Sequence, residues 1–212
     1  MLELFLAAFV TFFVVIDPPG VAPLFASMTE GTSAAWRRKM AFKSVGVATA
    51  VLLGFAFGGQ WLLSKLGVSL HAFKLAGGVL LFLIAVDMLF EKRTERRAER
   101  TEMVVEERAA HTGRFEDISV FPLAIPLIAG PGCIATIMLY FAQTTEPLAQ
   151  LVVLGGAAAN LLLTLIGFLL AGPLTKLMGA TVAAMITRIF GIILAALAAQ
   201  FIVDGVKGAF GI

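Results

Sequence analysis

The chain has 212 residues, of which 59% are hydrophobic and 14% charged, and its mean hydropathy is +0.96. Soluble domains carry about 25% charged residues, so this composition excludes an ordinary soluble protein. The net charge of +2 gives no reason to expect a nucleic-acid partner, and the lone cysteine, Cys133, excludes an internal disulfide. Fifteen of the thirty charged residues lie between Glu91 and Asp117. The remaining segments are almost free of charge, which predicts an all-α polytopic membrane protein embedded in a lipid bilayer.

Six apolar segments are long enough to cross a bilayer, which takes about 20 residues. They are residues 4–28, 43–64, 72–90, 119–142, 148–170 and 184–204. The Glu- and Arg-rich stretch between the third and fourth segments divides them three and three. We therefore expect a first three-helix repeat over residues 1–90, a charged cytoplasmic loop over 91–118, and a second repeat over 119–212.

Lysine and arginine are distributed unequally between the two sides of the predicted bundle. If the spans alternate in direction, thirteen of these residues lie on the side of the long charged loop and three on the other side. Cytoplasmic loops carry the excess of positive charge, so we expect both termini on the outer, periplasmic side of a bacterial inner membrane.

Helix-breaking residues interrupt two of the predicted spans at corresponding places. The first span contains Asp17-Pro18-Pro19-Gly20, and the fourth contains Gly130-Pro131-Gly132. Freed backbone polar groups cost several kcal/mol in lipid, so such a break survives where it is buried in protein or lines a cavity. Paired breaks of this kind are typical of the binding site of a transporter.

The two halves of the chain share a pattern at a nearly constant offset. Pro19-Gly20 corresponds to Pro131-Gly132 at an offset of 112, and Gly78 corresponds to Gly191 at an offset of 113. Homologous halves of three spans each sit inverted in the membrane. We therefore expect a 3+3 inverted repeat in which helices 1 and 4 are discontinuous.

The breaks predict a site for a small zwitterion. Half-helices that restart from about Gly20 and Gly132 would point N–H groups and positive dipole ends at the centre, where they suit a carboxylate. Carbonyls that end the preceding half-helices would accept from an ammonium group. The predicted substrate-binding residues are Asp17, Pro19, Gly20, Gly130, Pro131, Gly132 and Cys133. The alternative is a pair of proline kinks with no ligand.

Asp17 is an ionisable residue inside a span, which makes it a functional candidate. It either binds the ammonium group of the substrate or carries a proton, and the structural alternative is a helix cap. Asp87 and Gln200 correspond between the halves and are candidates for gating, or else lie at the interface. Asn160 is a candidate lining residue, with interhelical hydrogen bonding as the alternative. The sequence shows no nucleophile, phosphate-binding or metal motif, so we expect no enzyme, no metal and no cofactor.

Three stretches of the sequence resemble one protein family. Residues 16–25, Ile-Asp-Pro-Pro-Gly-Val-Ala-Pro-Leu-Phe, resemble the DPxGxxPxF signature of the MarC family of bacterial integral membrane proteins. Residues 122–132 look like the second signature of that family, and residues 187–202 are similar to its final span. The resemblance implies a six-span inner-membrane protein grouped with transporters of neutral amino acids such as glycine and alanine, with proton coupling in some members. Cys133 departs from the family pattern, which often has alanine at this position.

The leading hypothesis is therefore a secondary transporter of small neutral amino acids, with proton coupling as an open question. One alternative is an exporter of another small solute, a metabolite or a drug, that uses the same site. The other is a membrane scaffold or regulator that acts through residues 91–118. A homo-oligomer is plausible for so small a carrier.

Overall fold

The computed structural model describes residues 1–90, 99, 117–144 and 146–211, except for the side chains of residues 172–181, 183 and 184. Every regular element in this part of the chain is helical. The elements are α1 (Leu2–Ile16), α2 (Pro18–Met28), α3 (Ala34–Lys65), α4 (Leu70–Leu89), the irregular segment η1 (Ser119–Ile128), α6 (Pro131–Gln143), α7 (Pro147–Leu169) and α8 (Ala171–Phe210). Most of the predicted loop over 91–118 lies outside the described residues.

The described helices fit a polytopic membrane protein. Five of them are long and apolar enough to cross a bilayer, and there are six if the bent pair of η1 and α6 forms one span. The helices α1 and α2 count here as one span, Leu2–Met28, interrupted at Asp17. The predicted all-α polytopic architecture is therefore confirmed.

Two helices extend beyond their predicted apolar segments. The helix α3 begins at Ala34 rather than near residue 43, because Ser33 caps it by accepting the Trp36 N–H at 3.2 Å. The helix α8 runs over 40 residues, well past the predicted 184–204 at both ends. Hydropathy locates the apolar centre of such a helix but not its polar ends.

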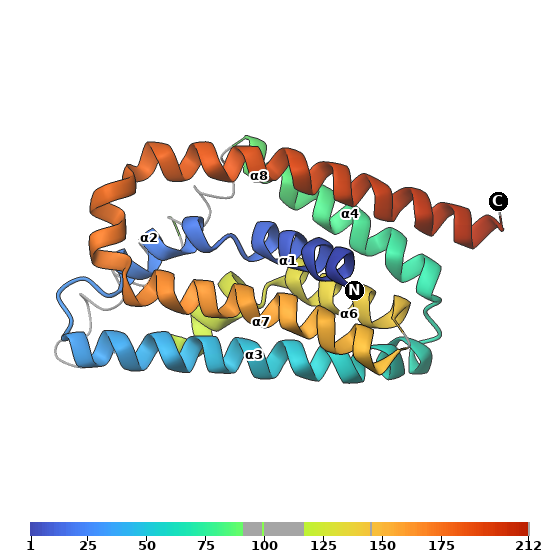
Figure 1. The fold of residues 1–212 in the computed structure, drawn as a ribbon, viewed down its shortest axis with the longest axis horizontal. Coiled ribbons are helices and arrows are strands. Elements are labelled where there is room, and N and C mark those ends of the chain that lie inside the picture. Colours follow the sequence, from blue (N-terminus) through green and yellow to red (C-terminus); the bar gives the residue numbers. More distant parts are fainter. Residues whose placement is uncertain (91–98, 100–116, 145, 212) are drawn as a thin grey trace.

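The interrupted spans occupy the centre of the bundle (Figure 1). The helices α1 and α2 run end to end between α7 and α8, while η1 and α6 pack against α3. Half of the apolar window in Leu2–Met28 is buried, against 22% in Met185–Phe210, so the first span is the central one. Both chain ends lie in the right-hand half of Figure 1, with the C-terminus at the far end of α8.

Glycines allow α4 and α8 to pack closely side by side. A Cβ at Gly78 would lie 2.8 Å from Ile202 Cγ1 and 3.0 Å from the carbonyl oxygen of Ala198. A Cβ at Gly205 would lie 2.7 Å from the backbone nitrogen of Leu75. Small residues permit such close backbone approach in membrane bundles. The helices α4 and α8 are therefore packed closely against each other, next to α1 and α2.

Candidate functional site

Asp17 forms the break between α1 and α2. Its backbone adopts the left-handed conformation, with φ of 59° and ψ of 63°. Asp is one of the few residues with a side chain that tolerates this region, because its short polar side chain hydrogen-bonds locally. Here its Oδ1 accepts the backbone N–H of Gly20 at 3.2 Å, so it caps α2. Only 1% of Asp17 is exposed.

The second half-helix starts earlier than predicted, at Pro18 rather than near Gly20. The reason is that proline suits the first helical position, where its fixed φ fits and its missing N–H would have no partner anyway. The same holds for the other break, where α6 begins at Pro131 rather than at Gly132. At α2 the predicted free N–H groups are largely absent, because Pro18 and Pro19 have none and Asp17 accepts that of Gly20.

The second break bends the chain by 58° between η1 and α6. Ala129 and Gly130 form the connection, and Gly130 caps α6 through its backbone without a side-chain hydrogen bond. The segment η1 is also irregular before the break, because Phe121 and Ile125 have extended backbones. Each of these residues precedes a proline, which disfavours helical conformation in the residue before it. The predicted break at Gly130 is therefore present, and the irregular backbone before it was not predicted from the sequence.

The two breaks lie next to each other. A Cβ at Gly132, just after the second break, would lie 3.4 Å from Val15 Cγ1, just before the first. On its other side the same position would lie 2.6 Å from Ile84 Cδ1 of α4. Cys133 follows in the first turn of α6 and is 1% exposed. Segments more than a hundred residues apart in sequence thus form one closed junction.

The sequence assigned no role to Thr187, yet this residue of α8 reaches the junction. Its hydroxyl lies 3.4 Å from Asp17 Oδ1 and 3.5 Å from Oδ2, and 4% of the residue is exposed. The hydroxyl is oriented to donate to the carboxylate. No local pattern indicates this contact, because a threonine in an apolar helix is usually an interhelical packing residue. Thr187 therefore joins Asp17 as a candidate functional residue.

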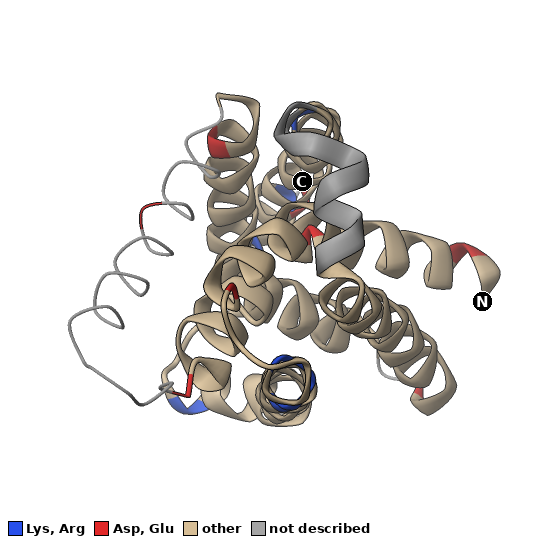
Figure 2. Cartoon of the chain, turned by 90° about the vertical axis from the view of Figure 1, so that its left-hand side faces the viewer, with Lys and Arg blue, Asp and Glu red and all other residues tan. Residues whose placement is uncertain are grey.

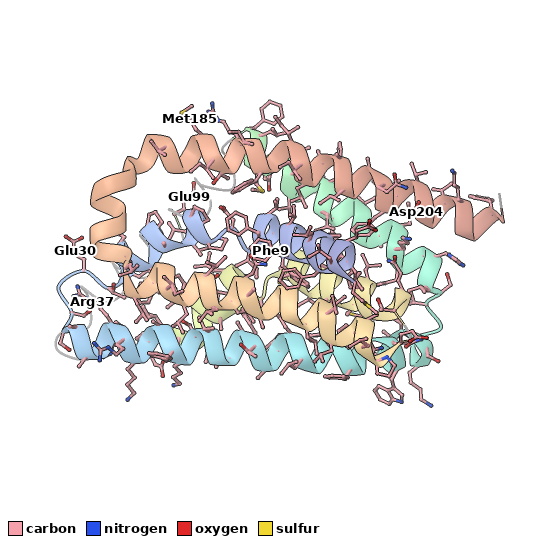
Figure 3. All side chains as sticks on the ribbon, in the orientation of Figure 1. Phe9, Glu30, Arg37, Glu99, Met185 and Asp204 are labelled. Carbon is pink, nitrogen blue, oxygen red and sulfur yellow. The ribbon has the colours of Figure 1, made fainter. Side chains whose placement is uncertain are left out.

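Asn160 lies on α7 and holds it against α1. Its Nδ2 donates to the carbonyl oxygens of Phe9 and Gly156, each at 2.9 Å, and the residue is fully buried. Figure 3 shows Phe9 on α1, where this contact forms. A Cβ at Gly156 would lie 3.0 Å from the backbone nitrogen of Phe9, so the two helices touch. Asn160 thus forms an interhelical hydrogen bond between α7 and α1, which is the alternative role considered for it above.

The two gating candidates lie apart on the α4–α8 pair. Asp87 is half-buried on α4 near its last turn. Gln200 is exposed on α8 and donates to Asp204 at 2.7 Å, and Asp204 pairs with Lys74 at 3.0 Å. Asp204 lies on α8 toward the end of the molecule that holds the chain termini (Figure 3). The Lys74–Asp204 ion pair was not predicted from the sequence.

An ion pair between Lys43 of α3 and Asp117 ties the start of η1 to α3. The Lys43 ammonium contacts Asp117, which also accepts the backbone N–H of Ser119 at 3.0 Å. Hydrogen bonding from Lys43, followed by that from Ser119, lowers the pKa of Asp117 from 3.8 to about 2. Both side chains are 45% exposed, so solvent screens the pair and it contributes little to stability.

The geometry defines a class: a polytopic helical membrane protein in which the break between α1 and α2, with its buried carboxylate, lies next to the bend between η1 and α6. A family model, "MarC family integral membrane protein", matches residues 2–210. The chain belongs to this family, as the sequence signatures predicted.

Three relatives show how far the likeness extends. A "UPF0056 membrane protein" of Methanocaldococcus jannaschii is 36% identical over 98% of both chains. The membrane protein YvbG of Bacillus subtilis is 33% identical over 79% of this chain and 77% of its own. The membrane protein YhcE of Escherichia coli is 34% identical over 62% of this chain and 59% of its own. No solved structure matches the chain.

Proposed function

We propose that this protein is a secondary transporter of small neutral amino acids, of glycine and alanine size. One observation carries the proposal: Gly132 of the second break lies against Val15, just before the first break, where Asp17 holds a carboxylate that is 1% exposed. Irregular backbone at membrane depth is tolerated where it is buried in protein or lines a cavity, and ionisable residues there mark transport pathways.

The two ends of a zwitterion suit different parts of the junction. Asp17 already caps α2, so its carboxylate is oriented at the junction and is the partner for an ammonium group. The start of α6 has no side-chain cap, and its positive dipole end is the partner for a carboxylate. Pro19, Gly20 and Gly130 are half-buried beside these groups, whereas Pro131 is exposed. Cys133 limits that space beside Gly132, which favours a small substrate side chain.

Thr187 gives the site a connection to α8. Its hydroxyl contacts the same carboxylate that caps α2, so a change at Asp17 reaches both the broken span and the α4–α8 pair. A proton on Asp17 would alter both contacts at once. We therefore assign proton coupling, where it occurs, to this residue.

An inverted repeat is part of the proposal, and reciprocal contacts support it. A Cβ at Gly78 would meet Ala198 O and Ile202, while one at Gly191 would meet Ala85 O and Leu89. Subtracting 113 from 191, 198 and 202 gives 78, 85 and 89, so each contact is the other with the halves exchanged. Two helices related in this way across a two-fold axis are the expected core of an alternating-access carrier.

The remaining assignments follow from this architecture. Asp87 and Gln200 occupy equivalent places toward opposite ends of the α4–α8 pair and are the proposed gating positions. The Lys and Arg distribution favours an inner-membrane protein with periplasmic termini. A homo-oligomer fits the small size of the chain, and transport without covalent chemistry needs neither a cofactor nor a metal.

Transport in proteoliposomes tests the proposal. Uptake and counterflow of radiolabelled glycine and alanine are measured with and without an inward proton gradient, for the wild type and Asp17→Asn. Glu146→Gln is the matched control, because it removes a carboxylate that is exposed and makes no side-chain cap. We expect saturable flux that falls about tenfold or more in Asp17→Asn, since a charged hydrogen bond contributes about 1.5–3 kcal/mol.

The outcomes separate the alternatives. Flux that survives in Asp17→Asn without its gradient dependence restricts Asp17 to coupling. If correctly folded wild-type protein moves neither amino acid, the substrate assignment is wrong. A scaffold or regulator would behave differently. Its function in the cell would be lost when residues 91–116 are shortened and would be retained in Asp17→Asn.

A further inference from the structure

A cavity opens at the end of the bundle opposite the chain termini. The ends of α2 and α7 and the beginnings of α3 and α8 surround it, and its volume is about 580 Å³. This volume lies within the range of about 300–1,000 Å³ that small-molecule sites occupy. The cavity is separate from the junction of the broken spans, because none of its lining residues belongs to either break.

One wall of this cavity is cationic. Arg37 and Arg38 line it from the first turns of α3, and neither forms an ion pair with any residue that the structure describes. The first turn of α3 contains no acidic residue. Cations at a helix N-terminus are unfavourable, because the helix dipole is positive there. Two adjacent guanidinium groups at this position therefore favour a bound anion.

The other walls are aromatic and apolar. Phe25 of α2 stacks on Phe168 of α7, with ring centroids 4.3 Å apart and planes at 8°. Phe42 lines the same cavity one turn below the arginines and is 54% exposed. The cavity thus offers a charged part and an apolar part side by side, which matches an amphiphile with an anionic head.

The cavity lies where the membrane surface is expected. Figure 2 looks onto this end of the molecule and shows Lys and Arg at the N-terminal end of α3. Figure 3 places Arg37 and Glu30 at this same end. Basic pockets between spans at the cytoplasmic surface bind the head groups of anionic lipids.

We propose that this cavity binds the phosphate head group of one anionic phospholipid, with Arg37 and Arg38 on the phosphate and the acyl chains along Phe42 and neighbouring apolar surface. A guanidinium group suits this ligand, because its donors match the geometry of phosphate oxygens. The apolar wall distinguishes a lipid from free phosphate, which would gain nothing from it. This inference does not depend on the proposed transport.

A tryptophan beside the site makes binding measurable. Trp36 precedes Arg37, whereas Trp61 lies near the other end of α3, about 38 Å away at 1.5 Å per residue. The Trp61→Phe protein in maltoside detergent therefore keeps a single tryptophan, Trp36, next to the arginines of the cavity. Its fluorescence is titrated with dioctanoyl phosphatidylglycerol, with dioctanoyl phosphatidylcholine, and with inorganic phosphate. Native mass spectrometry of the same samples counts retained phosphatidylglycerol, in case the emission does not change.

Single substitutions identify the site. We expect Arg37→Gln and Arg38→Gln each to weaken phosphatidylglycerol binding about tenfold, since hydrogen bonds to charged groups contribute about 1.5–3 kcal/mol. Lys39→Gln is the matched control, because it removes the same charge from the same turn without lining the cavity. The proposal would be overturned if all three substitutions weakened phosphatidylglycerol binding equally. It would also be overturned if none of them weakened it. Inorganic phosphate that saturates at the same concentration would overturn the assignment to a lipid.

Discussion

The contact between Gly20 and Asp17 can be tested by adding a single methyl group. In Gly20→Ala the new Cβ would overlap Asp17 Oδ2 and lie 2.7 Å from Cγ and 2.9 Å from Oδ1. The carboxylate has little room to move away, because it is buried and the Thr187 hydroxyl also contacts it. Gly20→Ala should therefore separate the carboxylate from the N–H that it caps.

The expected magnitude follows from two opposing contributions. Losing an N-cap costs about 0.5–2 kcal/mol, while alanine in place of a helical glycine contributes about 0.5–1 kcal/mol in the opposite direction. The central values of these two contributions leave a net destabilisation of about 0.5 kcal/mol, which lowers the melting temperature by about 1–2 °C for a chain of this size. Gly54→Ala is the matched control, because its Cβ would meet no atom within 4 Å.

Thermal unfolding of the purified proteins in detergent measures both variants. Gly54→Ala should unfold at the wild-type temperature or above it, and Gly20→Ala below it. A double-mutant cycle with Asp17→Gly isolates the cause, because in that background there is no carboxylate for the new Cβ to displace. If Gly20→Ala destabilises the Asp17→Gly protein as much as the wild type, the clash with the carboxylate is not the reason for the loss.

Three further changes probe other parts of the molecule. Thr187→Val should reduce amino acid uptake while Thr187→Ser retains it, and equal uptake by both would remove the hydroxyl from the site. Gly205→Ala should lower the melting temperature, because its Cβ would lie 2.7 Å from a backbone nitrogen, whereas Gly58→Ala has open space and should not. The Lys43–Asp117 pair lowers the carboxyl pKa in the folded state, so its stabilisation is present above the unfolded value of 3.8 and is lost as the pH falls through about 2. Thermal unfolding across this pH window should show a loss below about 1 kcal/mol that Lys43→Met reduces, because the hydrogen bonds from Ser119 remain, and a pH profile that Lys43→Met leaves unchanged would contradict the assignment.

The breaks themselves were predictable from the sequence. Proline and glycine interrupt a helix through local sterics, so Asp17-Pro18 and Gly130-Pro131 mark the interruptions without any tertiary information. The irregular backbone of η1 has an equally local cause in its two prolines, and the sequence contained that signal too. The effect of these prolines was not predicted, because residues 119–128 have the hydropathy of a continuous span.

Contacts between distant segments could not be predicted. The partner of Asp17 on α8 is 170 residues away, and nothing in the composition around Thr187 distinguishes it from other polar residues in spans. The same holds for Lys74, which pairs with Asp204, a residue 130 positions away in sequence. Such pairings depend on how helices are placed relative to one another, which local propensity does not determine.

Cys133 offers a means of observing the junction without altering it. It is the only cysteine of the chain, it follows the second break directly, and it is 1% exposed. A thiol reagent in water reacts with this protein only when the core around the breaks admits it, so the rate of labelling reports how often the junction opens. The native chain thus carries its own accessibility probe, and a substrate that closes the junction would slow the labelling.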